Sequence, residues 1–220
     1  NTVTNIGARA FKNLAQLTEF EFPNALLTIG EEAFYNCGLK ELKLPNTVKT
    51  IDKMAFANNE QLTSVEIPSS VVTFGEMAFY GCKGFNGNLI LGANVEIIEG
   101  GAFYGCSGIT EAIIANEGSI GTSAFYNCSS LAALTLGDNI SSIGANAFEG
   151  CSNLTKIEIP NKTTVLNEYC FAGCTKLTEV GFGTGIKTIG KHCFSGCAIQ
   201  SISIPENVTS IGDYTFYNCK

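Results

Sequence analysis

A phenylalanine recurs every 22 to 24 residues along this chain, and this regularity constrains its fold more than any other feature. Alanine precedes seven of these ten phenylalanines, and a cysteine follows eight of them three residues later. A fixed period of this length predicts a repeat architecture, in which each unit packs against its neighbours. The series consists of Phe11, Phe34, Phe56, Phe79, Phe103, Phe125, Phe148, Phe171, Phe194 and Phe216.

The residue pattern within each unit predicts two short strands and a turn. Residues 154–159, LTKIEI, alternate apolar and polar side chains, as expected of a strand that is buried on one side. Proline follows this strand in five units and marks its end, because proline donates no ladder hydrogen bond. A second apolar run, such as 208–212, closes with a glycine that suits a bend or a positive φ. The segment around AFxxC then predicts a single helical or 3₁₀ turn.

Stacking of these units predicts a β-rich solenoid of parallel strands, in which every phenylalanine lies above the previous one. We expect one such domain over residues 1–220, with about ten repeats. The sequence starts part-way through a unit and stops just after a repeat cysteine, without a polar capping unit. It therefore reads as a fragment of a longer protein, and its uncapped end turns predict either fraying of these turns or end-to-end packing between molecules that covers them.

The repeat resembles a known family of surface proteins. The matching pieces are LTEFEFP (17–23), LTSVEIP (62–68), LTKIEIP (154–160) and VTSIGDYTFYNC (208–219), and the resemblance covers essentially the whole chain. They are similar to the 23-residue leucine-rich repeats of the BspA-like surface antigens. This resemblance implies a leucine-rich-repeat solenoid that is secreted or attached to the cell surface and takes part in adhesion. Segments 85–92 and 112–117 depart from the pattern, because they lack the proline.

The composition argues against several functional classes. The formal net charge is −7 and no basic run occurs, so no nucleic-acid partner is expected. No apolar stretch approaches the length of a bilayer span, so membrane insertion is not expected either. His192 is the only histidine and falls at a variable, exposed position of the repeat. Because no nucleophile or carboxylate is predicted beside it, we expect neither an enzyme nor a cofactor.

The ten cysteines invite a disulfide or zinc interpretation, yet their positions favour buried free thiols. Eight of them occupy one repeat position, and Leu14 and Asn59 fill that position in the other two units. Cys37 therefore has no cysteine in a neighbouring unit, and the remaining seven are an odd number. The Cys170/Cys174 and Cys193/Cys197 spacings do not form a matched pair of zinc loops, so no metal is predicted.

Two surface features are candidates for ligand binding. The residue after the repeat phenylalanine is tyrosine in three consecutive units, which predicts a row of aromatic side chains. The alternating strand of each unit, such as residues 154–159, is the main strand. The exposed position at its centre carries no charged residue in the middle units, which predicts an apolar patch. The alternative interpretations are ordinary half-buried solenoid residues for the row and chance variation for the patch. The candidate ligand-binding residues are Tyr80, Tyr104, Tyr126, Ile90, Ile113, Ala133 and Thr135.

The sequence therefore favours a cell-surface or secreted module that binds a protein or glycan. A rigid spacer that displays another domain is the first alternative. An intracellular protein-interaction scaffold is the second, and free thiols would suit its reducing surroundings.

Overall fold

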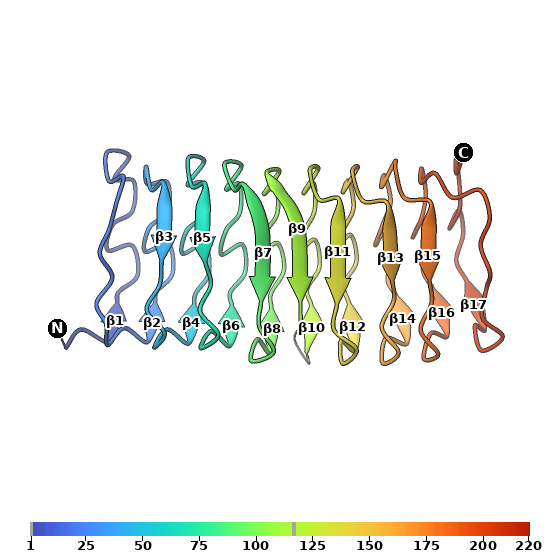
Figure 1. Ribbon diagram of the computed structural model, residues 1–220, viewed down its shortest axis with the longest axis horizontal. Helices are drawn as coiled ribbons and strands as arrows, with labels where there is room; N and C mark the ends of the chain where they lie inside the picture. The colour runs from blue at the N-terminus through green and yellow to red at the C-terminus, as the bar shows by residue number, and fades with distance from the viewer. Residues whose placement is uncertain (1, 116–117) are drawn as a thin grey trace.

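The computed structural model describes residues 2–115 and 118–220. Figure 1 shows an elongated stack of similar turns, with the two chain ends at opposite ends of the stack. Part of the proline-free segment 112–117 lies outside the described residues, because these exclude 116 and 117. The β-rich solenoid that the sequence predicts is confirmed.

One strand from each turn contributes to a ten-stranded parallel sheet, which follows the lower edge of the stack in Figure 1. Each strand has two residues, and the second is buried in nearly every turn. Ile120, for example, is in register with Ile98 on one side and Ile143 on the other. The strands are β1 (Asn5–Ile6), β2 (Thr28–Ile29), β4 (Thr50–Ile51), β6 (Thr73–Phe74), β8 (Ile97–Ile98), β10 (Ser119–Ile120), β12 (Ser142–Ile143), β14 (Val165–Leu166), β16 (Thr188–Ile189) and β17 (Ser210–Ile211).

The alternating segment of the repeat forms a second row of parallel strands, which faces the viewer in Figure 1. Its longest members, β7 and β9, lie in units without a proline, whereas the strands before a proline have three residues. The short strands agree with proline as the end of this strand in three units, but β15 has three residues without a proline, and residues 17–22 and 201–204, which precede prolines, form no strand. The strands are β3 (Glu41–Lys43), β5 (Ser64–Glu66), β7 (Gly87–Leu91), β9 (Ile109–Ile114), β11 (Ala133–Leu136), β13 (Lys156–Glu158) and β15 (Glu179–Gly181).

The repeat phenylalanines form one column through the core, as the period predicts. Consecutive rings are stacked with centroids 4.8–5.7 Å apart and interplanar angles of 3–16°. The eight inner rings are fully buried, and Phe11 and Phe216 at the ends of the column are half-buried. Inward side chains of the main-strand segment close the other side of the core, as where Phe85 meets Phe79 edge-on.

The expected helical or 3₁₀ turn around this phenylalanine is wrong, since none of the described residues forms a helix. Every second N–H of the segment points to the next turn instead: Phe125 N donates to Ala147 O at 2.8 Å. The N–H groups between them close tight turns within the same unit: Tyr126 N, for example, donates to Ser123 O at 3.1 Å. Residues two before and two after each phenylalanine have positive φ, which a right-handed helix does not allow.

Of the two expectations for the glycine after the second strand, a bend or a positive φ, the positive φ is wrong. Gly30, Gly75 and Gly144 are absent from the positive-φ residues. A Cβ atom on Gly144 would lie 2.5 Å from the backbone nitrogen of Thr122 in the preceding turn. Glycine is therefore required because successive turns approach one another closely at this point.

Candidate functional site

The predicted apolar patch forms on the outer face of β7, β9 and β11. Ile90 is in register with Ile113, and Ile113 with Thr135. Ile90 is 58% exposed, Ile113 is half-buried, and Ala133 and Thr135 are exposed. The structure therefore brings the four strand residues together on one surface, which we call the strand patch (Ile90, Ile113, Ala133 and Thr135).

Charged residues border the strand patch on both sides, and Glu111 of β9, in register with Ala133, lies within the same surface. On β5 and β3 the equivalent positions are Glu66 and Lys43, which are paired in register. On β13 the position is Glu158, whose carboxylate lies 3.1 Å from Lys156 Nζ. An apolar surface rimmed by charged side chains is typical of a contact site for another molecule.

The three tyrosines that the sequence predicts to form a row are stacked in the structure. The ring centroids of Tyr80 and Tyr104 are 5.1 Å apart, and those of Tyr104 and Tyr126 are 4.6 Å apart. All three side chains are half-buried. Burial, followed by the neighbouring Tyr126, raises the pKa of Tyr104.

All ten cysteines are free thiols, and the eight in the common repeat position act as hydrogen-bond donors. Each thiol reaches back to the carbonyl oxygen of the column phenylalanine in the turn before it. Cys106 Sγ lies 3.1 Å from Phe79 O, and Cys128 Sγ lies 3.3 Å from Phe103 O. A cysteine suits this position because it is small and apolar and still carries an S–H donor.

Burial makes these thiols poor nucleophiles. It raises the pKa of Cys82 and of Cys128 to about 12, from an ordinary value near 9. Cys106 and Cys151 also have raised pKa values because they are buried. Since the thiolate is the reactive form of cysteine, the cysteine ladder is unsuited to catalysis at neutral pH.

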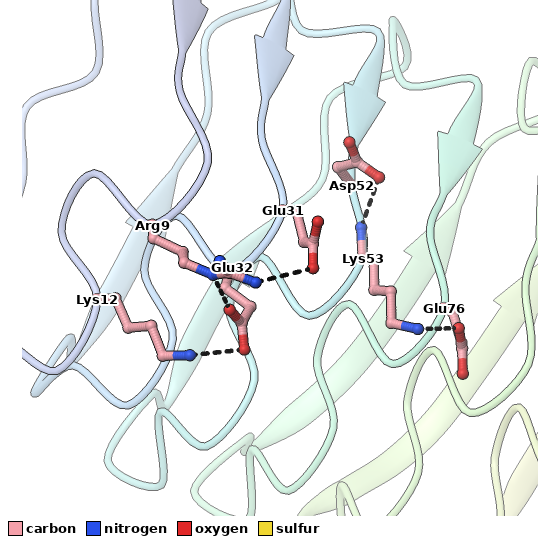
Figure 2. Close-up of polar contacts among 7 residues, drawn as sticks. All are labelled: Arg9, Lys12, Glu31, Glu32, Asp52, Lys53 and Glu76. Atoms are coloured by element: carbon pink, nitrogen blue, oxygen red, sulfur yellow. Dashed lines mark hydrogen bonds and ion pairs between the residues drawn. The ribbon is translucent and has the colours of Figure 1, made fainter.

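Ion pairs join successive turns near the N-terminal end (Figure 2). Glu32 accepts hydrogen bonds from Lys12 Nζ at 2.7 Å and from Arg9 Nε at 2.5 Å. The hydrogen bond from Lys12, followed by that from Arg9, lowers the pKa of Glu32. Lys53 Nζ pairs with Glu76 in the following turn at 2.5 Å. The Lys53–Glu76 pair is exposed on both sides and adds little stability, whereas the Glu32 side chain is only 13% exposed.

The described residues offer little for small-molecule or metal chemistry. A hollow of about 680 Å³ lies beside Phe22 and Lys43, well away from the strand patch. Within residues 2–115 and 118–220, no three His, Cys, Asp or Glu side chains are grouped as metal ligands. Nor does the described part of the chain contain a helix of the length and hydropathy needed to cross a membrane.

Comparison with known families supports the resemblance seen in the repeat. The family described as "BspA type leucine rich repeat region" matches this chain at residues 4–118 and 96–220. The two matches together cover almost the whole chain. The chain belongs to the BspA-type leucine-rich repeat family. A comparison with curated proteins finds no match.

Solved structures of bacterial leucine-rich repeat proteins share the fold. A leucine-rich repeat protein of T. pallidum is 24% identical, with 78% of this chain and 70% of that chain covered and a TM-score of 0.54. A leucine-rich cell surface protein from Faecalibacterium prausnitzii is 21% identical, with 99% and 75% covered and a TM-score of 0.52. A third, from Eubacterium ventriosum, is 22% identical, with 91% and 64% covered and a TM-score of 0.53.

Asn59 is the buried departure from this BspA-type repeat, in the position that cysteine fills elsewhere. Its Nδ2 donates to Phe34 O at 2.7 Å and to Phe56 O at 2.8 Å. The amide therefore replaces the thiol as the donor to the phenylalanine of the previous turn. Its Oδ1 is buried without a hydrogen-bond partner among the described residues. An unpaired buried acceptor lowers the free energy of unfolding.

We expect Asn59→Cys to raise the free energy of unfolding by about 1–2 kcal/mol, because it removes the unpaired acceptor and keeps a donor to Phe34 O. Asn59→Ala, the matched variant without a donor, should lower it. Urea unfolding of both variants beside the parent chain measures the two changes. Destabilisation by Asn59→Cys would contradict this explanation of the repeat position.

The structure places His192 differently from the sequence-based expectation of a lone exposed residue. It is half-buried, and its ring is stacked between Tyr169 and Tyr214 at centroid distances of 4.8 and 5.0 Å. The signal for this contact was the register itself, since all three residues lie two positions before a column phenylalanine. The imidazole thus belongs to an aromatic stack on the surface of this BspA-type solenoid.

Proposed function

We propose that this chain is a non-enzymatic binding module that is secreted or displayed on the cell surface and mediates adhesion to a protein or glycan. The observation that carries the proposal is the strand patch, in which Ile90 is 58% exposed beside Ile113. Isolated exposed apolar residues are common, but neighbours in register on a rigid sheet form a preorganised contact surface. The description of a structural neighbour as a cell surface protein supports the location.

Binding fits the side chains of this molecule better than catalysis. The only imidazole is stacked between two tyrosine rings, and the buried thiols keep their protons at neutral pH because their pKa values are raised. Open sheet faces of stacked repeats offer an extended and nearly rigid surface, so a partner can bind with little ordering of the module.

The test is the double variant Ile90→Lys with Ile113→Lys. We expect it to fold like the parent and to bind at least about tenfold more weakly, because two charges would be buried under the ligand. The measurement is binding to a panel of immobilised extracellular proteins and glycans, with the midpoint of thermal unfolding as the check on folding.

A matched control adds the same two charges elsewhere on the same face. Ser64 on β5 and Ser203, in the equivalent segment of a later unit, are both exposed, so Ser64→Lys with Ser203→Lys should retain the parent affinity. Equal binding by the isoleucine variant and the control would place the site elsewhere. A parent chain that binds no member of the panel would favour the rigid spacer.

A further inference from the structure

All seven tyrosines, the only histidine and both methionines occupy just two positions of the repeat. One position lies two residues before the column phenylalanine, and the other lies directly after it. We call the surface that they form the aromatic face. The earlier position holds Met54, Met77, Tyr169, His192 and Tyr214, and the later one holds Tyr35, Tyr80, Tyr104, Tyr126 and Tyr217.

At the earlier of the two positions, the backbone conformation does not favour the side chains that occupy it. Positive φ is required both two residues before and two residues after each phenylalanine. At the later of these sites all ten residues are asparagine or glycine, the types that tolerate this conformation. At the earlier site Met77, Tyr169 and His192 adopt φ values of 54–57°, although Gly101 serves the same site in another turn. Bulky residues in this region are strained, and strain of this kind accompanies function.

The middle of the aromatic face consists of the stacked Tyr80, Tyr104 and Tyr126, with Met77 beside them. The ring planes are inclined by 27° in the first pair and 14° in the second, so the rings cover each other's faces. Each half-buried ring therefore exposes mainly its edge. Sugar rings bind tyrosine by stacking on a free ring face, and only the end rings, Tyr80 and Tyr126, have a face that is not stacked on another tyrosine. A polypeptide that packs along the row fits it better.

Carboxylates predominate in the sequence around the row, although the Lys83 ammonium lies close enough to Tyr80 for the two groups to interact electrostatically. Residues 84–155 contain six carboxylates and no lysine or arginine. Glu149 follows Tyr126 in the same repeat position, and Glu99 begins the turn that holds Tyr104. No described lysine or arginine forms an ion pair with Glu99 or Glu149. By contrast, Lys53 and Lys83, which precede this region, are already paired with carboxylates.

We propose that the middle of the aromatic face binds a positively charged polypeptide segment, whose arginine side chains lie along Tyr80, Tyr104 and Tyr126 between Glu99 and Glu149. The guanidinium group is weakly hydrated and pairs with carboxylates, while the aliphatic part of the arginine side chain packs along the exposed edges of the tyrosine rings. The column phenylalanines and the inward residues of the main strands separate this site from the strand patch. The proposal is therefore independent of the proposed function.

The test uses two fluorescent peptides of equal length, a repeating Gly-Arg peptide and a repeating Gly-Gln peptide. Fluorescence anisotropy at low salt should show that the whole chain binds the arginine peptide about tenfold more tightly. Tyr104→Ala with Tyr126→Ala should weaken this binding by about tenfold. Glu149→Gln, which leaves the rings in place, should weaken it about threefold.

Two controls separate this site from others. Tyr35→Ala removes a tyrosine from the same repeat position as Tyr104, but outside residues 84–155. Ile90→Ser with Ile113→Ser alters the strand patch instead. Both variants should keep the parent affinity for the arginine peptide. Three results would overturn the proposal: equal affinity for the two peptides, parent affinity in the tyrosine variant, or loss of binding in the isoleucine variant. Tighter binding of a neutral oligosaccharide than of the arginine peptide would also reject it.

Discussion

Phe125→Ala is expected to lower the free energy of unfolding by about 3–5 kcal/mol, because it leaves a cavity in the middle of the column. The Phe125 ring is fully buried and stacked between Phe103 and Phe148 at centroid distances of 5.1 and 5.3 Å. Both stacking contacts are lost with the ring. Because each turn is stabilised mainly by its neighbours, the damage should extend to the adjacent turns. Urea unfolding followed by circular dichroism measures the loss.

Phe11→Ala is the matched control at the end of the column. The Phe11 ring is half-buried and has Phe34 as its only partner within the column. We expect about half the loss found for Phe125→Ala, because less apolar area leaves the core. Equal losses at the two positions would mean that the column is not the continuous core described above.

The second large effect is expected at alkaline pH. Buried Cys82 and Cys128 have pKa values of about 12 in the folded chain, whereas an exposed thiol has a value near 9. Above pH 9 the unfolded chain releases these protons and the folded chain keeps them, so stability is full below pH 9 and is lost as the pH rises towards 12. For each of these thiols, the free energy of unfolding should fall by about 1.4 kcal/mol for every pH unit between pH 9 and pH 12.

The double variant Cys82→Ser with Cys128→Ser isolates this effect. A serine hydroxyl still donates to the phenylalanine carbonyl, but it does not titrate in this range. Urea unfolding at pH 8 and at about pH 10.5 should therefore show a smaller alkaline loss in the variant than in the parent, by about 4 kcal/mol. An identical pH dependence in the two proteins would show that these thiols do not remain protonated in the folded chain.

The period of the phenylalanines was sufficient to predict the fold, because in-register stacking follows from one repeated position. Each residue at that position meets its equivalents in the adjacent turns, as Phe103 meets Phe79 and Phe125. The same register predicted the tyrosine row and the alignment of Ile90 with Ile113. These are properties of the repeat, which the sequence displays directly.

The conformation of the turn could not be predicted from the same pattern. Around Phe125 the residues are compatible with a helix, but the N–H of Phe125 donates to Ala147 in the next turn. This hydrogen bond depends on stacking rather than on local sequence. Asparagine or glycine two residues after each phenylalanine was one signal of the left-handed backbone. No such signal exists two residues before it, where Tyr169 and His192 adopt the same conformation.

The orphaned Oδ1 of Asn59 was equally invisible in the sequence. The repeat showed that Asn59 takes the place of a cysteine, but not which of its amide atoms would find a partner. That outcome depends on two carbonyl oxygens, those of Phe34 and Phe56, which both turn towards its Nδ2.

Thiol labelling tests the stacked solenoid most directly, because eight cysteines mark the same point in eight different turns. Alkylation of the native chain without reductant, followed by mass spectrometry, should leave the nine buried thiols unmodified and label mainly Cys219, which is half-buried. In denaturant, still without reductant, all ten should be labelled. Rapid native labelling of several inner cysteines, or the loss of four or more thiols in the denatured chain, would contradict the buried free-thiol ladder.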